Sequence, residues 1–211
     1  MPVIINKNIE VPRLIILRGS PAVGKSTIAS KVASLNSAKK KALITVDNFQ
    51  LYDLRPMSKS REKLAIKNSA VLTKNFLLEG FDVVVEYVFD DVEDHKNFVD
   101  IILNDTLGKL DTIYFQSFYL DAPIEKIIKR NQSRSGKHGE YMNVALLRKI
   151  YARVSDTKGI IETEIFIDTT KYSAKQCARY ILSFSKAYKN NENLEEISLP
   201  EKDLLRALED E

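Results

Sequence analysis

The stretch that most constrains this chain is Gly19-Ser20-Pro21-Ala22-Val23-Gly24-Lys25-Ser26-Thr27, which fits the pattern G-x-x-x-x-G-K-[ST] at every fixed position. Residues 14–17 precede it as a short apolar run, which is typical of a buried parallel strand. Ile28, Val32 and Leu35 follow at helical spacing, so the stretch joins a strand end to a helix start. Backbone N–H groups and the helix dipole converge there and favour an anion. We name residues 19–27 the phosphate loop and predict that all nine bind a nucleoside triphosphate.

Three residues of the phosphate loop have distinct expected roles. Gly24, like Gly19 at the start of the loop, allows backbone conformations and a close approach that a Cβ atom would prevent. Lys25 can reach the β- and γ-phosphates, and the Ser26 hydroxyl can ligate Mg²⁺. The alternative, a chance match in an ordinary turn, is disfavoured because a strand and a helix flank the motif.

Strand-like and helix-like segments alternate along the rest of the chain. Strands are predicted at residues 14–17, 42–46, 82–86, 112–120 and 164–168, and helices at 59–79, 92–107, 123–132, 141–154 and 174–189. Residues 48–58 are predicted to be a loop, and Gly80 is expected to end the helix before it. This alternation predicts an α/β fold, in which helices flank a five-stranded parallel sheet through right-handed crossovers.

Composition separates the body of the chain from its end. The net charge is +3, but residues 190–211 carry eight acidic and two basic side chains, which leaves +9 on residues 1–189. We predict one domain over 1–189 and an acidic tail over 190–211 with a short helix, which packs on the body, contacts a partner or is mobile. The single Cys177 is expected in the core, and no apolar run approaches a membrane span. The cytoplasm is therefore the expected compartment, and the oligomeric state stays open.

Carboxylates end two of the predicted strands, beside the place where ligands bind in open α/β sheets. Asp47 follows the second strand and is a candidate general base, with helix capping as the alternative. Glu86 ends the third strand and is a candidate for holding Mg²⁺ or binding the acceptor, a role that Asp90 and Asp91 could share. His95, near the start of the next helix, is expected on the surface.

Arg130 and Arg134 belong to a basic region over residues 123–153, where a polar, glycine-containing break separates two predicted helices. This composition is typical of a lid that closes over a substrate, and we place the lid at about residues 131–142. Arginines delivered by such a lid stabilise charge that develops in a transition state. The alternative is a solvated pair of basic helices, which we favour for Arg148 and Arg153.

These segments resemble the P-loop kinase group that includes polynucleotide 5′-hydroxyl kinases, zeta toxins and antibiotic phosphotransferases. The resemblance covers residues 13–188 and rests on the phosphate loop, Val46-Asp47-Asn48-Phe49, Lys129-Arg130-Asn131 with Arg134, and Ile167-Asp168-Thr169-Thr170. It implies a P-loop NTPase fold of the nucleoside monophosphate kinase-like type, with a helical lid and with ATP and Mg²⁺ bound. It also implies that Asp47, Arg130 and Arg134 are catalytic and that Thr169 lies near the adenine. Lys25 is a further catalytic candidate from the phosphate loop, and Ser26 and Glu86 are the candidates for holding the metal.

One position departs from that group. Polynucleotide kinases usually carry an arginine three residues after the catalytic aspartate, where it contacts a substrate phosphate, and this chain has Gln50 there. Arg55 or Arg61 could substitute for it. We therefore expect an ATP-dependent kinase whose acceptor is a hydroxyl of a small or nucleotide-like molecule, with nucleic acid 5′ ends as an alternative partner. A nucleotide-gated binding protein with slow ATPase activity is the alternative from another class. A GTPase is disfavoured because the chain has no N-K-x-D sequence.

Overall fold

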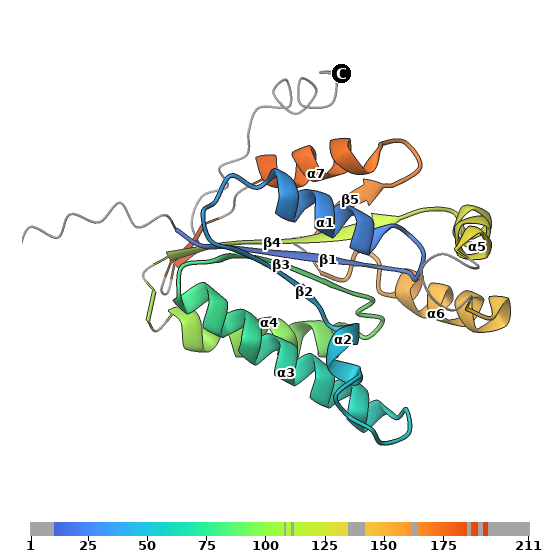
Figure 1. The fold of residues 1–211 in the computed structure, drawn as a ribbon, viewed down its shortest axis with the longest axis horizontal. Coiled ribbons are helices and arrows are strands. Elements are labelled where there is room, and N and C mark those ends of the chain that lie inside the picture. Colours follow the sequence, from blue (N-terminus) through green and yellow to red (C-terminus); the bar gives the residue numbers. More distant parts are fainter. Residues whose placement is uncertain are drawn as a thin grey trace, which may run out of the picture.

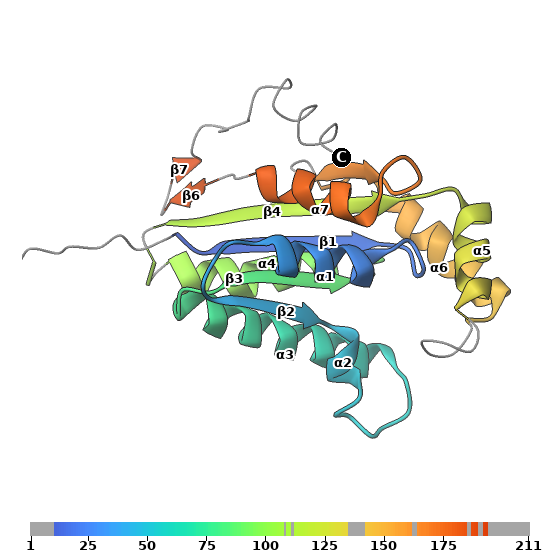
Figure 2. The same ribbon diagram turned by 45° about the horizontal axis from the view of Figure 1, so that its top comes forward.

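Five parallel strands form the centre of the fold, in the spatial order β2-β3-β1-β4-β5 (Figures 1 and 2). They are β1 (Arg13–Gly19), β2 (Lys41–Thr45), β3 (Asp82–Tyr87), β4 (Thr112–Asp121) and β5 (Ile165–Asp168). The computed structural model describes residues 11–107, 109–110, 112–134, 142–161, 164–184, 187–189 and 192–193. Over these residues the predicted five-stranded parallel sheet is confirmed.

Helices cover both faces of the sheet and its carboxyl end. They are α1 (Lys25–Leu35), α2 (Asp47–Gln50), α3 (Lys59–Leu78), α4 (Val92–Leu107), α5 (Ile124–Ser133), α6 (Val144–Asp156) and α7 (Ala174–Ser183). Figure 1 shows α1 and α7 on one face, α3 and α4 on the other, and α5 and α6 beyond the ends of the strands. The sheet thus has two covered faces, and its carboxyl end lies beneath α5 and α6.

The core has two layers because β1 buries both of its faces. Ile15 and Leu17 pack in the layer beneath α1 and α7, whereas Leu14 and Ile16 pack in the layer beneath α3 and α4. All four side chains are at most 4% exposed. An alternating pattern would have left one face polar, so the continuous apolar run is what a two-sided parallel sheet requires. Cys177 is buried in the first layer, as predicted.

The last predicted helix is too long by six residues. Helix α7 ends at Ser183, Phe184 is extended, and β6 (Ala187–Lys189) pairs antiparallel with residues 112–114 of β4. Phe184 turns the chain because its ring packs edge-to-face on Phe118 and Tyr180, with centroids 5.9 and 4.8 Å away. β6 also pairs with the short β7 (Glu192–Asn193). The rest of the predicted acidic tail, with its short helix, lies outside the described residues.

Three smaller predictions can be compared with the structure. Gly80 follows the end of α3 with a φ of 77°, the left-handed conformation expected of a glycine there. The loop predicted at residues 48–58 begins instead with the single helical turn α2. The surface position predicted for His95 is wrong, because the first turns of α4 face the sheet and its ring, 4% exposed, packs on Phe89. No helix in the described part of the chain is long and apolar enough to cross a membrane.

Candidate active site

The phosphate loop connects the end of β1 to the first residue of α1, so its backbone faces the amino terminus of that helix. Gly19 and Gly24 have φ angles of 146° and 116°, which side chains rarely tolerate. A Cβ atom on Gly19 would lie 2.4 Å from the Leu120 carbonyl oxygen of the neighbouring strand. Ala22, between the two glycines, is also left-handed, with a φ of 62°. The loop has the open backbone conformation in which N–H groups can surround a phosphate.

Lys25 is buried beneath the phosphate loop. Its Nζ donates to the carbonyl oxygens of Gly19 and Ser20, at 2.9 and 3.0 Å. Burial holds the pKa of Lys25 below its usual range, although the charges of Glu86 and Asp47 oppose that shift. The ammonium group is thus held at the loop by carbonyl oxygens, from which it can turn to a bound phosphate.

Ser26 and Glu86 bring two oxygen atoms together beside Lys25. The Ser26 hydroxyl donates to Glu86 Oε1 at 3.0 Å, and the Thr45 hydroxyl donates to the same oxygen at 3.0 Å. Glu86 is 3% exposed at the end of β3, so its carboxylate points into the space above the loop rather than into bulk water. Mg²⁺ prefers oxygen ligands and usually takes one or two from the protein, the rest from phosphates and water. The donor set at Ser26 and Glu86 fits that ion.

Asp47 is the first residue of α2, and only Val46 separates it from the end of β2. The N-cap of α2 is Val46 and receives no side-chain cap bond, so the capping role considered for Asp47 has no support here. Its carboxylate has a long contact of 3.5 Å with the Gln50 amide. Although solvent reaches the side chain, surrounding protein replaces much of its water and raises the pKa of Asp47. Lys25 opposes that rise, whereas Glu86 and Glu62 add to it.

Two cavities flank the phosphate loop. The first, which we name the nucleoside cavity, has a volume of about 330 Å³ and is lined by Val23, Thr27, Arg130, Thr169 and Tyr172, among others. The second, the acceptor cavity, has a volume of about 400 Å³ and is lined by Lys25, Ser26, Asp47, Gln50, Glu62 and Glu86, among others. Arg134 and Ala22 line both cavities. A molecule in each cavity would therefore meet the other at Ala22 and Arg134, next to Lys25 and Ser26 on the lining of the acceptor cavity.

The two predicted lid arginines occupy different positions. Arg130 is bound within the protein, since Nη1 donates to the Val23 carbonyl and the Thr169 hydroxyl, both at 2.9 Å, and Nη2 donates to the Thr169 carbonyl at 2.8 Å. It thereby ties α5 to the phosphate loop and to the turn after β5. Arg134, at the end of α5, lies at the boundary of the two cavities, and its charge contributes to the lowered pKa of Lys25.

The predicted lid lies largely outside the described residues, which resume at Met142. The described ends of that segment are joined, because the Asn131 side chain donates to the Met142 carbonyl at 2.8 Å and accepts from its N–H at 3.3 Å. Thr169, predicted near the adenine, lines the nucleoside cavity, and its hydroxyl donates to the Val23 and Asp121 carbonyls. The turn after β5 is thus bonded directly to the phosphate loop.

Two residues of the acceptor cavity, Glu62 and Tyr87, were not singled out from the sequence. The Tyr87 hydroxyl donates to Glu62 Oε1 at 2.9 Å, and the Gln50 amide lies 3.4 Å from the same hydroxyl. Burial and the charge of Glu62 raise the pKa of Tyr87. Asp90 lines the acceptor cavity and pairs with Arg153 at 2.6 Å, whereas Asp91 pairs with Lys59 at 3.6 Å. The position of Tyr87 immediately after Glu86 was the available signal.

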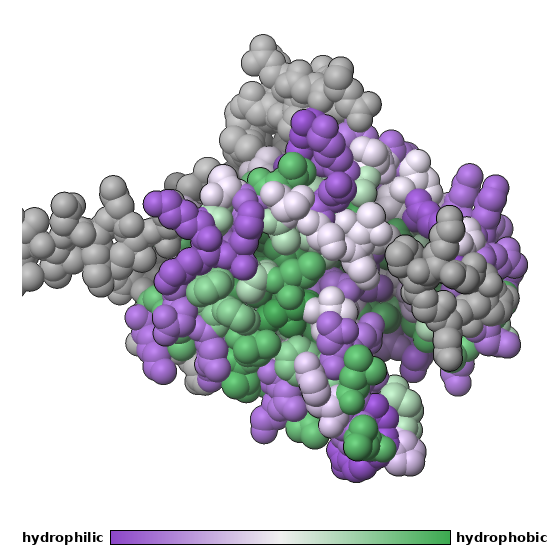
Figure 3. Space-filling view, viewed as in Figure 1, coloured by the Kyte–Doolittle hydropathy of each residue, from purple (hydrophilic) through white to green (hydrophobic). Residues whose placement is uncertain are grey.

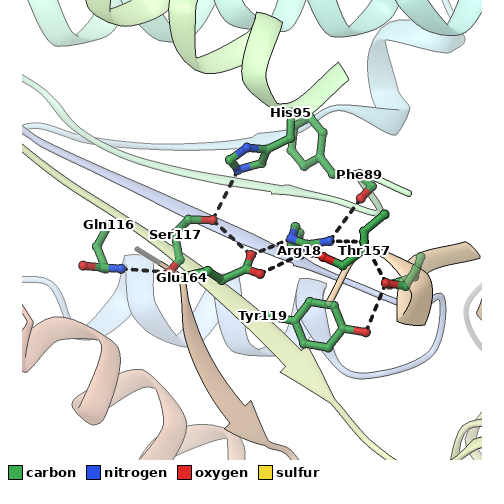
Figure 4. Close-up of polar contacts among 9 residues, drawn as sticks. Arg18, Phe89, His95, Gln116, Ser117, Tyr119, Thr157 and Glu164 are labelled. Carbon is green, nitrogen blue, oxygen red and sulfur yellow. Dashed lines mark hydrogen bonds and ion pairs between the residues drawn. The ribbon is translucent and has the colours of Figure 1, made fainter. Parts of the chain in front are cut away.

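Behind the phosphate loop, Arg18 is the centre of a buried polar network (Figure 4). Its Nη2 donates to Glu164 Oε2 at 2.6 Å, and its Nη1 donates to the Thr157 hydroxyl at 2.7 Å and the Phe89 carbonyl at 3.3 Å. Arg18 directly precedes Gly19, so the network fixes the strand end from which the loop starts. The signal in the sequence was a cation at the end of an apolar run.

The proximity of Arg18 also affects His95. The Nε2 atom of His95 lies 3.3 Å from the Ser117 hydroxyl, which in turn donates to Glu164 Oε1 at 3.4 Å. Burial, together with the charge of Arg18, lowers the pKa of His95 to about 4. The ring is therefore neutral at pH 7 and belongs to the support of the loop rather than to either cavity.

No known protein-family model matches the sequence. Solved structures with the same fold include a chain of the Pnkp1/Rnl/Hen1 RNA repair complex (19% identity, TM-score 0.57), the tunicamycin resistance protein of Deinococcus radiodurans (20%, 0.57) and a gluconokinase from Sinorhizobium meliloti (15%, 0.56). The match covers 75% of this chain and 48% of the repair-complex chain. For the tunicamycin resistance protein and the gluconokinase it covers 82% of this chain, and 94% and 91% of those chains, respectively. The chain thus spans about half the length of the repair-complex chain. These structures share the P-loop kinase fold predicted from the sequence.

Proposed function

We propose that this chain is an ATP-dependent kinase that transfers the γ-phosphoryl group to a hydroxyl of a small molecule. The observation that carries the proposal is the pair of cavities that share Ala22 and Arg134 in their linings, with Lys25, Ser26 and Asp47 all on the lining of the acceptor cavity. Phosphoryl transfer needs a donor and an acceptor in line across the transferring group. The similarity to solved kinases supports the fold, and the arrangement of these side chains supports the reaction.

Asp47 is assigned as the base. Its carboxylate takes the proton of the acceptor hydroxyl as the new oxygen–phosphorus bond forms and the bond to the β-γ bridging oxygen breaks, which leaves ADP. The raised pKa of Asp47 makes the carboxylate a better proton acceptor than an aspartate in water. Mg²⁺ held by Ser26 and Glu86 would neutralise charge on the β- and γ-phosphates.

Three cations have separate roles in this proposal. Lys25 contacts the β- and γ-phosphates, where it replaces its present carbonyl contacts. Arg134, on the boundary of the two cavities, stabilises charge that develops on the transferring group. Arg130 is a positioning residue, because its bonds to Val23 and Thr169 hold the loop and the nucleoside cavity in register.

The acceptor cavity favours a small molecule over a phosphate-bearing strand. Gln50 replaces the arginine expected for a phosphate, and neither proposed substitute lines the acceptor cavity. Arg55 pairs with Asp53, with Nε 2.9 Å from Oδ1, and Arg61 donates to the carbonyl oxygens of Gln50 and Arg55. Lys25 and Arg134 are assigned to the ATP phosphates and Arg153 pairs with Asp90, so an anionic acceptor would meet the remaining carboxylates of the lining, Asp47, Glu62 and Glu86. Polynucleotide 5′-hydroxyl kinase activity is therefore the second candidate, supported by the likeness to the RNA repair complex.

Transfer of labelled γ-phosphate tests the proposal. Purified protein, ATP and Mg²⁺ are incubated with separate pools of sugars, amino alcohols, nucleosides and 5′-hydroxyl oligonucleotides, and labelled products are resolved by chromatography. We expect a labelled small molecule with wild type and none with Lys25→Ala, while Lys175→Ala, an exposed substitution on α7, behaves as wild type. Labelled oligonucleotide alone would support the second candidate. ATP hydrolysis that no pool accelerates would instead indicate a nucleotide-gated binding protein and refute both.

A further inference from the structure

The connection between α2 and α3 exposes an unusual amount of apolar surface. Within the described residues, its four large apolar side chains are the most exposed of their kind: Leu54 at 94%, Tyr52 at 81%, Leu51 at 72% and Met57 at 67%. The next, Ile160, is 55% exposed. We name these four side chains the apolar lip. Figure 3 shows apolar side chains gathered there, below α2. Gathered rather than scattered apolar groups mark a surface that binds something.

The apolar lip is presented by a segment whose polar groups bind one another. Asp53 and Arg55 form an ion pair, with Arg55 Nη2 2.5 Å from Asp53 Oδ2. Arg61, in the first turn of α3, donates to the carbonyl oxygens of Gln50 and Arg55, and so fastens both ends of this stretch. The segment therefore has internal bonds that hold its shape. Tyr52 packs edge-to-face on Phe49, with ring centroids 6.1 Å apart, but its side chain stays largely exposed.

The apolar lip is continuous with the acceptor cavity. The chain leaves that cavity at Gln50 and returns to it at Met57, and both residues line it. On the other side of α2 lies a cavity of about 300 Å³, whose apolar lining comes from Phe49, Tyr52, Leu54, Leu64 and Ala65. That volume is at the lower end of the range of ligand pockets. One molecule could thus place a polar end near Asp47 and an apolar end on the lip.

We propose that the acceptor is amphipathic, with a hydroxyl-bearing neutral or cationic head in the acceptor cavity and an apolar tail or ring on the apolar lip. The proposal rests on the proposed kinase function, because that function places the acceptor hydroxyl at Asp47. Of the cations on the same lining, Arg153 pairs with Asp90, and Lys25 and Arg134 are assigned to the ATP phosphates. With ATP bound, the carboxylates of Asp47, Glu62 and Glu86 therefore disfavour an anionic head. The continuity through Met57 favours one ligand over a separate protein partner, whose contact would have no reason to begin inside the cavity.

A fluorescent reporter measures tail binding directly, without ATP. The chain has no tryptophan, so Tyr52→Trp places a single reporter in the apolar lip. The probes are n-butyl and n-octyl β-glucoside and n-octyl phosphate, each below its micelle concentration. A half-buried methylene contributes roughly twofold to affinity, so octyl glucoside, with four more methylenes, should bind about 16-fold more tightly than butyl glucoside. In the same background, Leu51→Ser with Leu54→Ser should remove this difference, and Ile160→Ser, an exposed apolar residue elsewhere, should keep it.

A second comparison tests whether the tail site joins the acceptor cavity. This comparison is made with a saturating non-hydrolysable ATP analogue and Mg²⁺, so that the phosphate loop, Lys25 and Arg134 are already occupied. Octyl phosphate should then bind at least about tenfold more weakly than octyl glucoside, because its anionic head meets the carboxylates. Asp47→Asn with Glu62→Gln should narrow that gap, whereas Asp100→Asn with Glu125→Gln, two exposed carboxylates outside the cavity, should leave it unchanged. If Asp47→Asn with Glu62→Gln left the difference in affinity between octyl glucoside and octyl phosphate unchanged, the proposal would be overturned. The alkyl-binding site would then be separate from the acceptor cavity.

Three further results would overturn the amphipathic acceptor. They are no binding of octyl glucoside, affinity that does not depend on alkyl length, and self-association that the Leu51→Ser, Leu54→Ser variant removes while probe binding stays unchanged. The last would make the lip a protein contact. Because the readout involves no phosphoryl transfer, its failure is distinct from failure of the kinase proposal. A chain that binds the probes as expected but transfers no phosphoryl group would refute the kinase and leave the tail site standing.

Discussion

Asparagine at position 47 removes the charge and basicity of the proposed base with little change of shape. General-base catalysis contributes roughly 10²–10⁴-fold, so we expect kcat to fall by at least about 100-fold, equivalent to about 2.7 kcal/mol of transition-state stabilisation. The KM for ATP should stay within about twofold, because Asp47 lines the acceptor cavity and not the nucleoside cavity. Folding stability should change little, since the carboxylate makes no cap bond to α2.

The pH dependence of wild-type kcat/KM is an independent test of Asp47 as the general base. Burial raises the pKa of Asp47, and the charge of Glu62 adds to the rise. A base works in its deprotonated form, so kcat/KM should fall as the pH drops through that raised pKa. Glu62→Gln removes a negative charge, which lowers the Asp47 pKa and should move the acid limb to lower pH. If the acid limb of kcat/KM lies at the same pH in Glu62→Gln as in wild type, the limb is set by the titration of a group other than Asp47.

The assay follows ADP release with the acceptor found in the transfer screen, at saturating ATP and varied acceptor. Asp100→Asn, an exposed aspartate on α4, is the matched control and should behave as wild type. Thermal unfolding of both variants separates lost chemistry from lost structure. The assignment fails if Asp47→Asn retains activity within about threefold of the control. Unfolding at a temperature several degrees lower, with activity intact, would restore the capping role.

Three other perturbations test separate parts of the structure. Arg134→Gln should lower kcat more than it raises the KM for ATP, whereas Arg148→Gln, exposed on α6, should change neither; steady-state kinetics decide this. Gly19→Ala should lower the free energy of unfolding by roughly 2–4 kcal/mol in denaturant titrations, because backbone strain at a positive φ adds to a 2.4 Å clash with a carbonyl oxygen. Gly159→Ala is the control, since Gly159 has a φ of 78° but nothing within 4 Å of an added Cβ atom, and it should show the effect of backbone strain alone. The pKa of His95 in the folded protein is lowered to about 4, so the stability that comes from its neutral form is fully present above pH 6.5. Up to about 3 kcal/mol of this stability is lost as the pH falls from 6.5 to 4. In His95→Gln, the temperature of thermal unfolding should therefore depend less on pH across that range.

The sequence was informative wherever local order and chemistry coincide. The run at residues 14–17 predicts a strand because both faces of β1 are buried, and the phosphate loop is a contiguous motif whose glycines serve its own backbone. Asp47 and Glu86 were predictable for a related reason. Each ends a parallel strand, so the sheet must bring both to the same edge, and the structure places them on the lining of one cavity.

Contacts between distant segments were harder to predict. His95 and Arg18 lie 77 positions apart, and nothing in the local pattern of α4 shows which charge its first turns will meet. Phe184 ends α7 through packing on Phe118, a contact that helical periodicity cannot report. The apolar lip was hidden for the opposite reason. Apolar residues in a loop usually turn inward, so its exposure becomes visible only in the folded chain.

Arg18 connects the support of the phosphate loop to the position of α6. Its guanidinium binds Thr157, which caps the end of α6, and Glu164, which precedes β5. The other end of α6 follows Met142, whose backbone is bonded to Asn131 of α5. The helices beside Arg134 are thus fixed to the sheet through the residue that precedes Gly19. A buried pair broken on one side leaves an uncompensated charge, so a change at Glu164 should disturb the loop and α6 together, although neither Arg18 nor Glu164 lines a cavity described here.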